Sequence, residues 1–315
     1  MYNKIIDKWK YSIVLDTNIY DFLLKSLKKE NANEQCRRAV ALLVFCQLSQ
    51  IEVDPALAVQ EKLNTHNLEE TIKDLEMFHN LNNAESNMIA NYALGKSKRL
   101  NIQYTTNFNY KETKEKLLLY EKPDEWNSIY LMILKIASIY SDNSIQFQNR
   151  ITIFLEWSIS EFRLVLPSVI YALILFGKKP ASKMMKYKRD DTSEQKSKCL
   201  VNMTWDLFHI KDFFLKWSKK REGEEYIFAS DDKVFGKILY LAIQVQLNGN
   251  LETLRPYLED FDFKNSTKLL MVNNPSINRV YGTSEWTSKY RENKILEYEH
   301  KLGLYPTNNP KFSED

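Results

Sequence analysis

Aspartates follow short apolar runs at two places far apart in the chain. The run YSIVL (11–15) ends at Asp16, and the run YIFAS (226–230) ends at Asp231 and Asp232. Runs of this length and composition are typical of buried strands. Because parallel strands open on a common crevice at their carboxyl ends, we expect Asp16 and Asp232 to share one edge of a sheet.

Carboxylates that meet at one place repel each other, and a bound divalent cation removes that cost. Mg²⁺ and Mn²⁺ prefer hard oxygen ligands such as carboxylates. Two such ions about 4 Å apart can activate water and stabilise the leaving oxygen of a phosphodiester. The pattern therefore indicates metal-assisted hydrolysis, and Asp16→Asn is expected to relieve repulsion and leave the metal-free fold intact or more stable.

Two further acids lie on predicted helices. An Asp-Pro pair, which is a helix-start signal, follows the apolar run IEV (51–53), and the helix PALAVQEKL that begins there carries Glu61. The amphipathic helix predicted over 200–217 carries Asp206. Glu61 and Asp206 are the remaining candidates for the acidic site.

These segments, in this order, resemble the motifs of the PIN-domain nucleases. IVLDTNI, with Asp16, Thr17 and Asn18, is similar to the first motif, an apolar strand followed by Asp-Thr-Asn. The second motif is a Glu on a helix after the second strand, which matches Glu61. The third is an Asp that opens a helix of apolar and small residues, which matches Asp206 in TWDLFHIKDFF.

The fourth PIN motif is an apolar strand, Thr or Ser, any residue, Asp, two residues and Phe. IFASDDKVF matches it with Ser230, Asp232 and Phe235. That register favours Asp232 over Asp231 as the metal ligand. The resemblance implies an α/β fold, with a PIN-like parallel sheet flanked by helices and a long all-helical insertion.

The resemblance also implies roles for these residues toward one or two Mg²⁺ or Mn²⁺ ions. Asp16 and Asp232 would bind the metal directly, Asp206 would complete its shell, and Glu61 would orient the attacking water. Hydrogen bonds would brace the loops around these four catalytic acids. The supporting residues are Thr17, Asn18, Ser230 and Asp231.

The expected activity is a cytoplasmic endonuclease that hydrolyses RNA, with DNA the less favoured substrate. Similar bacterial nucleases act as toxins or in defence against phage, so that role is implied here too. The alternative is a catalytically inactive PIN-like scaffold that binds nucleic acid or protein. A phosphatase is disfavoured because Asp16 is not part of an Asp-x-Asp pair.

Three parts of the chain are distinguished by composition. The PIN-like domain is expected over 1–63 and 200–273, with a last strand at 267–274. The insertion, 64–199, consists of helical segments and could hold a protein inhibitor or partner. The tail, 274–315, is polar and is expected to lie along the surface.

A basic segment ends the predicted insertion. Residues 177–198 contain eight Lys or Arg and three acids, and are expected to form a mobile loop. The candidate RNA contacts in it are Lys178, Lys179, Lys183 and Lys186. The alternative is a solvated charge run with no ligand.

The composition of the chain argues against several classes of protein and kinds of site. The chain has 315 residues, 44% of them hydrophobic, so it can bury a large core. Its net charge of +3 is too small for a protein that coats nucleic acid through its overall charge. Three Cys and four His lack metal-ligand spacing, which disfavours a zinc site or a disulfide framework. The longest apolar run is too short for a membrane span, and the N-terminus has no signal-peptide layout.

Each candidate also has a structural interpretation. Asp16 and the Asp231-Asp232 pair could cap helices, and Glu61 could be an ordinary surface charge. His209, one turn after Asp206, could face the same crevice, but a core or surface histidine without a role in the site is the preferred interpretation. The tryptophans on apolar helices are interpreted as core residues rather than base-stacking platforms.

Overall fold

The structure is a computed structural model that describes residues 8–28, 33–102, 108–180, 184–188, 190–272 and 287–304. The chain forms two compact units. Unit 1 comprises 1–122 and 215–232, and unit 2 comprises 123–214 and 233–315. These units do not follow the predicted ranges, because the first helices of the expected insertion pack in unit 1 and the chain after Asp232 packs in unit 2.

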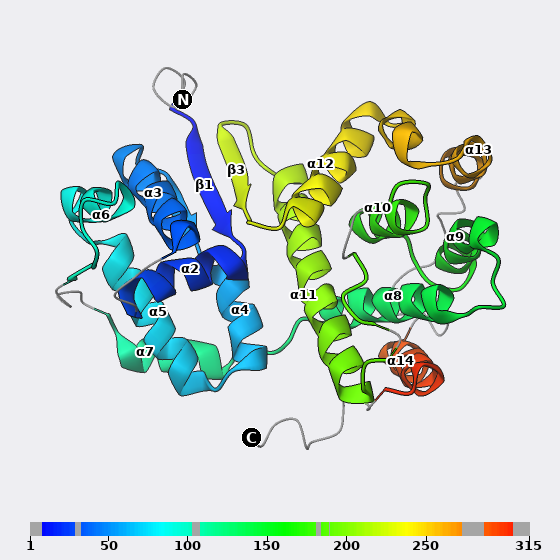
Figure 1. The fold of residues 1–315 in the computed structure, drawn as a ribbon, viewed down its shortest axis with the longest axis horizontal. Helices are drawn as coiled ribbons and strands as arrows, with labels where there is room; N and C mark the ends of the chain where they lie inside the picture. The colour runs from blue at the N-terminus through cyan, green and yellow to red at the C-terminus, as the bar shows by residue number, and fades with distance from the viewer. Residues whose placement is uncertain are drawn as a thin grey trace. The chain divides into compact units, whose positions relative to one another are not determined.

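Unit 1 contains a small sheet and its covering helices (Figure 1). Its elements are β1 (Lys10–Leu15), α2 (Thr17–Lys28), α3 (Glu34–Leu48), β2 (Glu52–Asp54), α4 (Ala56–Thr65), α5 (Leu68–Asn82), α6 (Ser86–Ala93), α7 (Tyr110–Leu118) and β3 (Glu224–Ala229).

Within the described residues of unit 2, the regular elements are all helices. Its elements are α8 (Asp124–Ser141), η1 (Phe147–Asn149), α9 (Arg150–Ser160), α10 (Leu166–Leu175), most of α11 (Ser193–Ser218), α12 (Lys233–Asn248), η2 (Glu252–Tyr257), α13 (Asp260–Thr267), the π-helical η3 (Lys268–Val272) and α14 (Ser288–Leu302).

The sheet of unit 1 has three parallel strands in the order β2-β1-β3. Central β1 ends in the buried residues Ile13, Val14 and Leu15, as its apolar composition predicts. Val14 pairs with Asp54 and Leu15 with Ala229, so all three strands end at the same edge. The expected α/β class with a parallel sheet is therefore confirmed, in a chain that is mostly helical.

The predicted last strand at 267–274 is wrong over the residues that the structure describes. The chain there forms the end of α13 and the π-helical turns of η3. The Thr267 hydroxyl donates to the Phe263 carbonyl at 2.8 Å, which closes a helical turn. Residues 273 and 274 lie outside the described part. A short apolar run such as KLLMV has no periodicity that separates strand from helix, which explains the error.

The described part of the predicted tail, 287–304, forms helix α14, which packs against α8 in unit 2 and leaves most of its residues exposed. The Thr287 side chain caps the helix by accepting from the Tyr290 N–H, and Gly303 ends it in the left-handed conformation, with φ 64°. Glu299 is buried and accepts a 2.9 Å hydrogen bond from the Tyr130 hydroxyl. The few apolar positions of this segment gave too weak a helical pattern to reveal its buried face.

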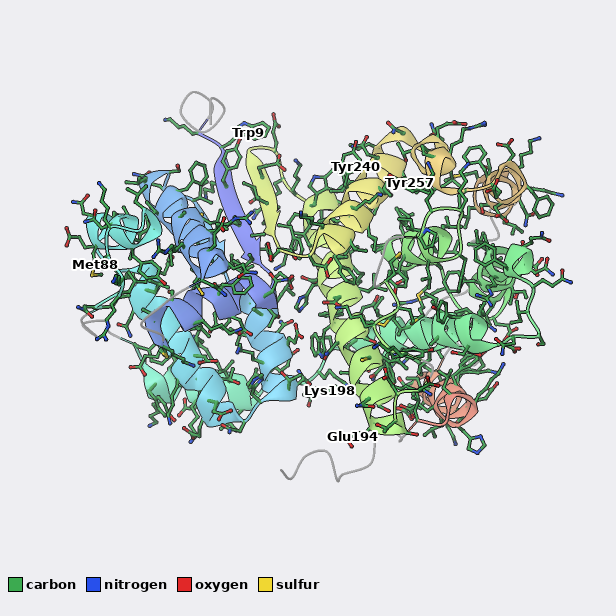
Figure 2. The ribbon with its side chains drawn as sticks, in the orientation of Figure 1. Trp9, Met88, Glu194, Lys198, Tyr240 and Tyr257 are labelled. Carbon is green, nitrogen blue, oxygen red and sulfur yellow. The ribbon has the colours of Figure 1, made fainter. Side chains whose placement is uncertain are left out.

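The prediction of a mobile loop over 177–198 is also wrong in part. Met184 and Tyr187 are buried, and Ser193 begins α11, whose first turns carry Glu194 and Lys198 (Figure 2). The segment is thus anchored by two apolar side chains and ends as helix. Within the described part of the chain, none of the helices has the length and apolar content needed to cross a bilayer.

Candidate active site at the carboxyl edge of the sheet

Asp16 is the residue at which β1 becomes α2. Its backbone N–H continues the sheet by donating to the Ala229 carbonyl at 2.9 Å, and its carbonyl accepts from the Tyr20 N–H at 3.1 Å, in the first turn of α2. The residue is only 8% exposed. Its side chain is therefore fixed at the carboxyl end of the central strand.

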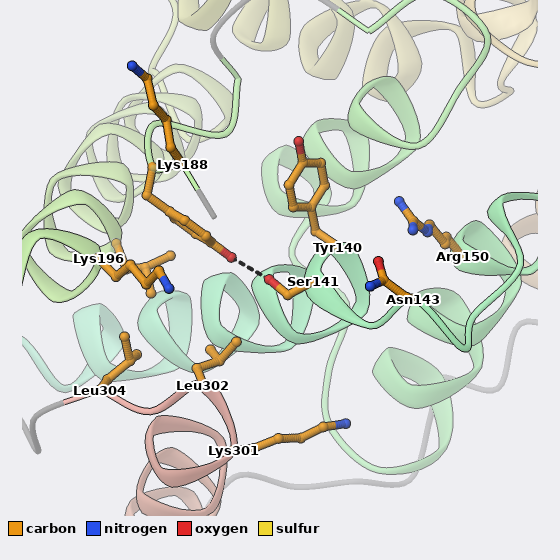
Figure 3. Close-up of a pocket in the computed structure, with 11 residues that line it drawn as sticks. Tyr140, Ser141, Asn143, Arg150, Lys188, Lys196, Lys301, Leu302 and Leu304 are labelled. Atoms are coloured by element: carbon orange, nitrogen blue, oxygen red, sulfur yellow. Dashed lines mark hydrogen bonds between the residues drawn. The ribbon is translucent and has the colours of Figure 1, made fainter. Parts of the chain in front are cut away.

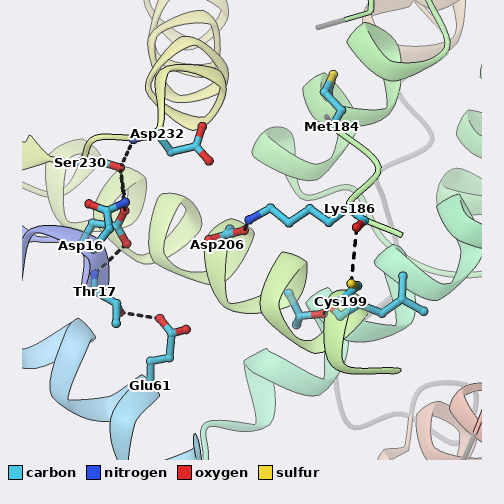
Figure 4. Close-up of polar contacts among 12 residues, drawn as sticks. Asp16, Thr17, Glu61, Met184, Lys186, Cys199, Asp206, Ser230 and Asp232 are labelled. Atoms are coloured by element: carbon cyan, nitrogen blue, oxygen red, sulfur yellow. Dashed lines mark hydrogen bonds and ion pairs between the residues drawn. The ribbon is translucent and has the colours of Figure 1, made fainter. Parts of the chain in front are cut away.

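Three donors converge on the Asp16 carboxylate (Figure 4). The Ser230 hydroxyl and the Asn18 amide each donate to Oδ2 at 2.6 Å, and the Thr17 N–H donates to Oδ1 at 2.8 Å. Charged acceptors form hydrogen bonds of this length, and the bonds compensate for burial of the carboxylate. None of these three bonds is a capping contact, because a cap accepts from a backbone N–H two or three residues further on.

The same side chains connect the ends of β1 and β3. The Asp232 N–H donates to the Ser230 hydroxyl at 3.0 Å, and the Asp231 N–H donates to the Asn18 side-chain oxygen at 3.1 Å. Asp231 is exposed and Asp232 half-buried. Asp16 and Asp232 thus lie at one edge of the sheet, as the strand ends predict.

Glu61 reaches this edge from α4. The Thr17 hydroxyl donates to its Oε2 at 2.5 Å. Helix α4 begins directly after β2, where the Asp54 carboxylate accepts from the Ala56 N–H at 2.9 Å. The Asp-Pro pair therefore begins a helix whose first turn is hydrogen-bonded to the end of β2. Glu61 lies in the second turn of that helix.

A buried lysine beside Glu61 holds α4 against its neighbours. The Lys62 ammonium lies 2.8 Å from Asp21 on α2 and 3.1 Å from Asp74 on α5. Burial opposes the charge on Lys62, but hydrogen bonds to Asp21 and Asp74 outweigh it and raise its pKa. Burial likewise acts against the Asp74 carboxylate, while bonds from Lys28 and Lys62 lower its pKa overall. This ion cluster was missed in the sequence because its members lie on three helices.

Asp206 belongs to unit 2 and lies in the middle of α11. It does not open a helix, since α11 begins at Ser193. Its carboxylate forms an ion pair with Lys186, and the Lys186 ammonium also lies 5.2 Å from the Phe235 ring centroid (Figure 4). Asp16, Asp232 and Glu61 thus lie at the carboxyl edge of the sheet in unit 1, whereas Asp206 belongs to unit 2 and pairs with Lys186.

The candidate RNA-binding lysines differ in their surroundings. Lys178 and Lys179 are exposed, and their contact with RNA stays a prediction. Lys183 lies outside the described residues. Lys186 instead faces Asp206, so its charge is already balanced. His209 is a core residue against Trp205. Trp126, Trp157 and Trp205 are buried, as predicted, whereas Trp217 is only half-buried.

A groove of about 300 Å³ runs along the sheet in unit 1 and ends at Ser230 and Asp231. Apolar side chains from α2, such as Phe22, line it together with Phe228 and the exposed Arg38. An apolar floor with one guanidinium could hold a planar base and a phosphate beside the acids. No local sequence pattern predicts this groove, because its walls come from four separate segments.

The donor set of the site has the right chemistry for Mg²⁺ or Mn²⁺, since carboxylate and hydroxyl oxygens are the ligands that these ions prefer. Within the described ranges, however, no three His, Cys, Asp or Glu side chains come together as a metal site. Comparison with models of protein families, with curated proteins and with solved structures finds no match for this chain.

We expect Thr17→Val to lower activity about tenfold while changing stability little. The substitution removes the hydroxyl that orients Glu61 and keeps the size of the side chain, and losses of 10–100-fold are usual when such an orienting bond is removed. Glu61→Gln is the matched variant, because an amide oxygen still accepts from Thr17 while the charge is gone. A lower kcat in both Thr17→Val and Glu61→Gln, with unchanged melting temperatures, would support a role for Thr17 in orienting Glu61. Full activity of Glu61→Gln would exclude Glu61 as a base.

Proposed function

We propose that this chain is a metal-dependent endonuclease of the PIN type that acts on RNA. One observation carries the proposal: the Ser230 hydroxyl donates to the Asp16 carboxylate at 2.6 Å, across 214 positions of sequence. This bond joins the segment that resembles the first PIN motif to the segment that resembles the fourth. Capping of α2 alone does not require a hydroxyl from another strand.

The acids of unit 1 would have different roles in hydrolysis. Asp16 and Asp232 would hold a divalent cation, which supplies positive charge to a phosphoryl oxygen. Glu61 would accept the proton of the attacking water, with Thr17 fixing the direction of its carboxylate. Ser230 and Asn18 would keep the Asp16 carboxylate aligned at the end of β1.

The substrate proposal rests on the resemblance and on the groove beside the acids. Arg38 and the apolar wall formed by Phe22 and Phe228 suit a single-stranded segment, whose bases are free to stack and whose phosphates attract a guanidinium. RNA is therefore preferred to duplex DNA. Action as a toxin or in phage defence remains part of this proposal.

A second candidate, an inactive PIN-like scaffold, is favoured by a specific observation. The carboxylate that would complete the metal shell, that of Asp206, is paired with the Lys186 ammonium. A site that lacks a free third carboxylate would bind a divalent cation weakly. The working part would then be a binding surface rather than the acidic edge.

Cleavage of a single-stranded RNA in Mn²⁺ distinguishes the two candidates. We expect cleavage that EDTA abolishes, and a loss on the order of 100-fold or more in Asp232→Asn, since even residues that only support a metal ligand cost up to that much. Asp231→Asn is the matched control, because Asp231 is the exposed neighbour whose backbone N–H forms its contact with Asn18. Equal activity of Asp231→Asn and Asp232→Asn, or no Mn²⁺ binding by calorimetry, would favour the scaffold.

A further inference from the structure

A second cavity lies entirely within unit 2 and has a volume of about 600 Å³. It is formed by the end of α8, the start of α9, the segment around Tyr187, the first turns of α11 and the end of α14 (Figure 3). Its size falls within the roughly 300–1,000 Å³ typical of sites for small molecules and cofactors. None of the predicted acidic-site residues lines it.

Four cationic side chains surround this cavity. They are Arg150, Lys188, Lys196 and Lys301. Among the described residues that line the cavity, none is acidic. Because four like charges around one space repel each other, a ligand that brings several negative charges would be strongly favoured there.

Few carboxylates of the described residues lie against these charges; among them is that of Asp191, which accepts from the Lys188 backbone N–H at 2.6 Å. Within the described ranges, no carboxylate forms an ion pair with Arg150, Lys188 or Lys196. Lys301 lies 3.7 Å from Asp142, just outside the lining. Both side chains of this pair are partly exposed, so solvent screens the attraction between them.

The cavity also offers an aromatic and apolar surface. The Arg150 guanidinium lies 6.0 Å from the ring centroid of Tyr140, which is 40% exposed. The Tyr187 ring is held in the wall by a 2.8 Å hydrogen bond between its hydroxyl and that of Ser141. Leucines complete the lining: Leu200, Leu302 and Leu304. A ligand with a planar ring as well as charged groups would use both kinds of surface.

We propose that this cavity binds a nucleotide that carries two or more phosphates. The cations from α9, α11 and α14 take the phosphates, and Tyr140, Tyr187 and the leucines take the ring. Four charges exceed what a monophosphate uses, and the apolar lining exceeds what inorganic polyphosphate uses. The proposal does not depend on the acidic edge of unit 1, because every residue that it invokes belongs to unit 2.

Calorimetric titration of the full chain tests the assignment, with EDTA present so that no divalent cation occupies the acidic edge. The probes are ATP, ADP, AMP, adenosine and inorganic tripolyphosphate. We expect affinity to fall in the order ATP, ADP, AMP, with no binding of adenosine and binding of tripolyphosphate at least tenfold weaker than that of ATP. Equal binding of ATP and tripolyphosphate would overturn the nucleotide assignment.

The double variant Lys188→Ser with Lys196→Ser should weaken ATP binding at least tenfold. Lys233→Ser with Lys264→Ser is the matched control, since it removes the same charge from exposed positions of unit 2 outside the cavity. Melting temperatures without ligand should be equal in all three proteins. No ATP binding by the wild type, or equal weakening by both double variants, would overturn the proposal.

Discussion

Asp16→Asn should abolish RNA cleavage and also lower the melting temperature of the metal-free protein. The amide of an asparagine presents one oxygen and one NH₂ group, whereas the Asp16 carboxylate accepts from Ser230, Asn18 and the Thr17 N–H. At least one donor would lose its acceptor at a buried position, which costs about 1–3 kcal/mol. Charge repulsion alone predicted the opposite sign for stability.

The test compares thermal melts in EDTA for the wild type, Asp16→Asn and Asp232→Asn. Asp232 is the control because it contacts Ser230 through its backbone N–H, which the substitution preserves. We expect a clear drop in melting temperature for Asp16→Asn and a smaller change for Asp232→Asn, with activity lost in both. An Asp16→Asn protein as stable as the wild type would show that repulsion, not hydrogen bonding, dominates at this edge.

The second large effect is expected for Lys62→Met, which should destabilise the protein by about 3 kcal/mol. Loss of one partner of a buried ion pair costs about 3–5 kcal/mol, and the lower end applies because Asp74 keeps its 2.8 Å contact with Lys28. Asp21 and Asp74 would then face each other without the ammonium between them. Because Lys62 adjoins Glu61 on α4, kcat should fall as well.

The stability that Lys62→Met removes should depend on pH in a defined way. The lowered pKa of Asp74 means that its contribution is complete above the ordinary aspartate value of about 3.9 and is lost as pH falls through the lower folded value. The raised pKa of Lys62 means that its contribution is complete below about 10.4 and is lost at higher pH. The stability difference between wild type and Lys62→Met should thus be constant from about pH 5 to 9.

Urea unfolding across this pH range measures the difference, with Lys25→Met as the control. Lys25 is an exposed lysine on α2, so its substitution removes the same charge without opening a buried cluster. Destabilisation by Lys62→Met that equals that of Lys25→Met would mean that the ion cluster contributes no more than a surface charge.

Local patterns predicted the sheet edge well. The apolar runs before Asp16 and Asp231 are β1 and β3, and the Asp-Pro pair begins the helix that carries Glu61. Each of these patterns is contained in about ten residues. Such a pattern marks a strand end or a helix start, and both are determined by side chains that are close together in the sequence. The parallel pairing then followed from the rule for strand ends.

Structural features that depend on residues far apart in the sequence could not be predicted from such local patterns. Lys186 looked like a free cation in a basic loop, and only its approach to Asp206 shows that the two charges balance. The cationic cavity draws Arg150, Lys196 and Lys301 from three helices that no sequence period connects. The buried face of α14 rests on a few residues, among them Ile295 and Tyr298, within a strongly polar segment.

The division of unit 1 has a consequence for synthesis on the ribosome. Its first part ends at residue 122 and its second begins at residue 215, so the chain makes 123–214 before β3 exists. Until then, Asp16 lacks the strand that supplies Ser230 and the neighbouring Asp232. The emerging chain therefore lacks the Ser230 hydrogen bond to Asp16, and the neighbouring Asp232, until β3 has been synthesised and has paired with β1.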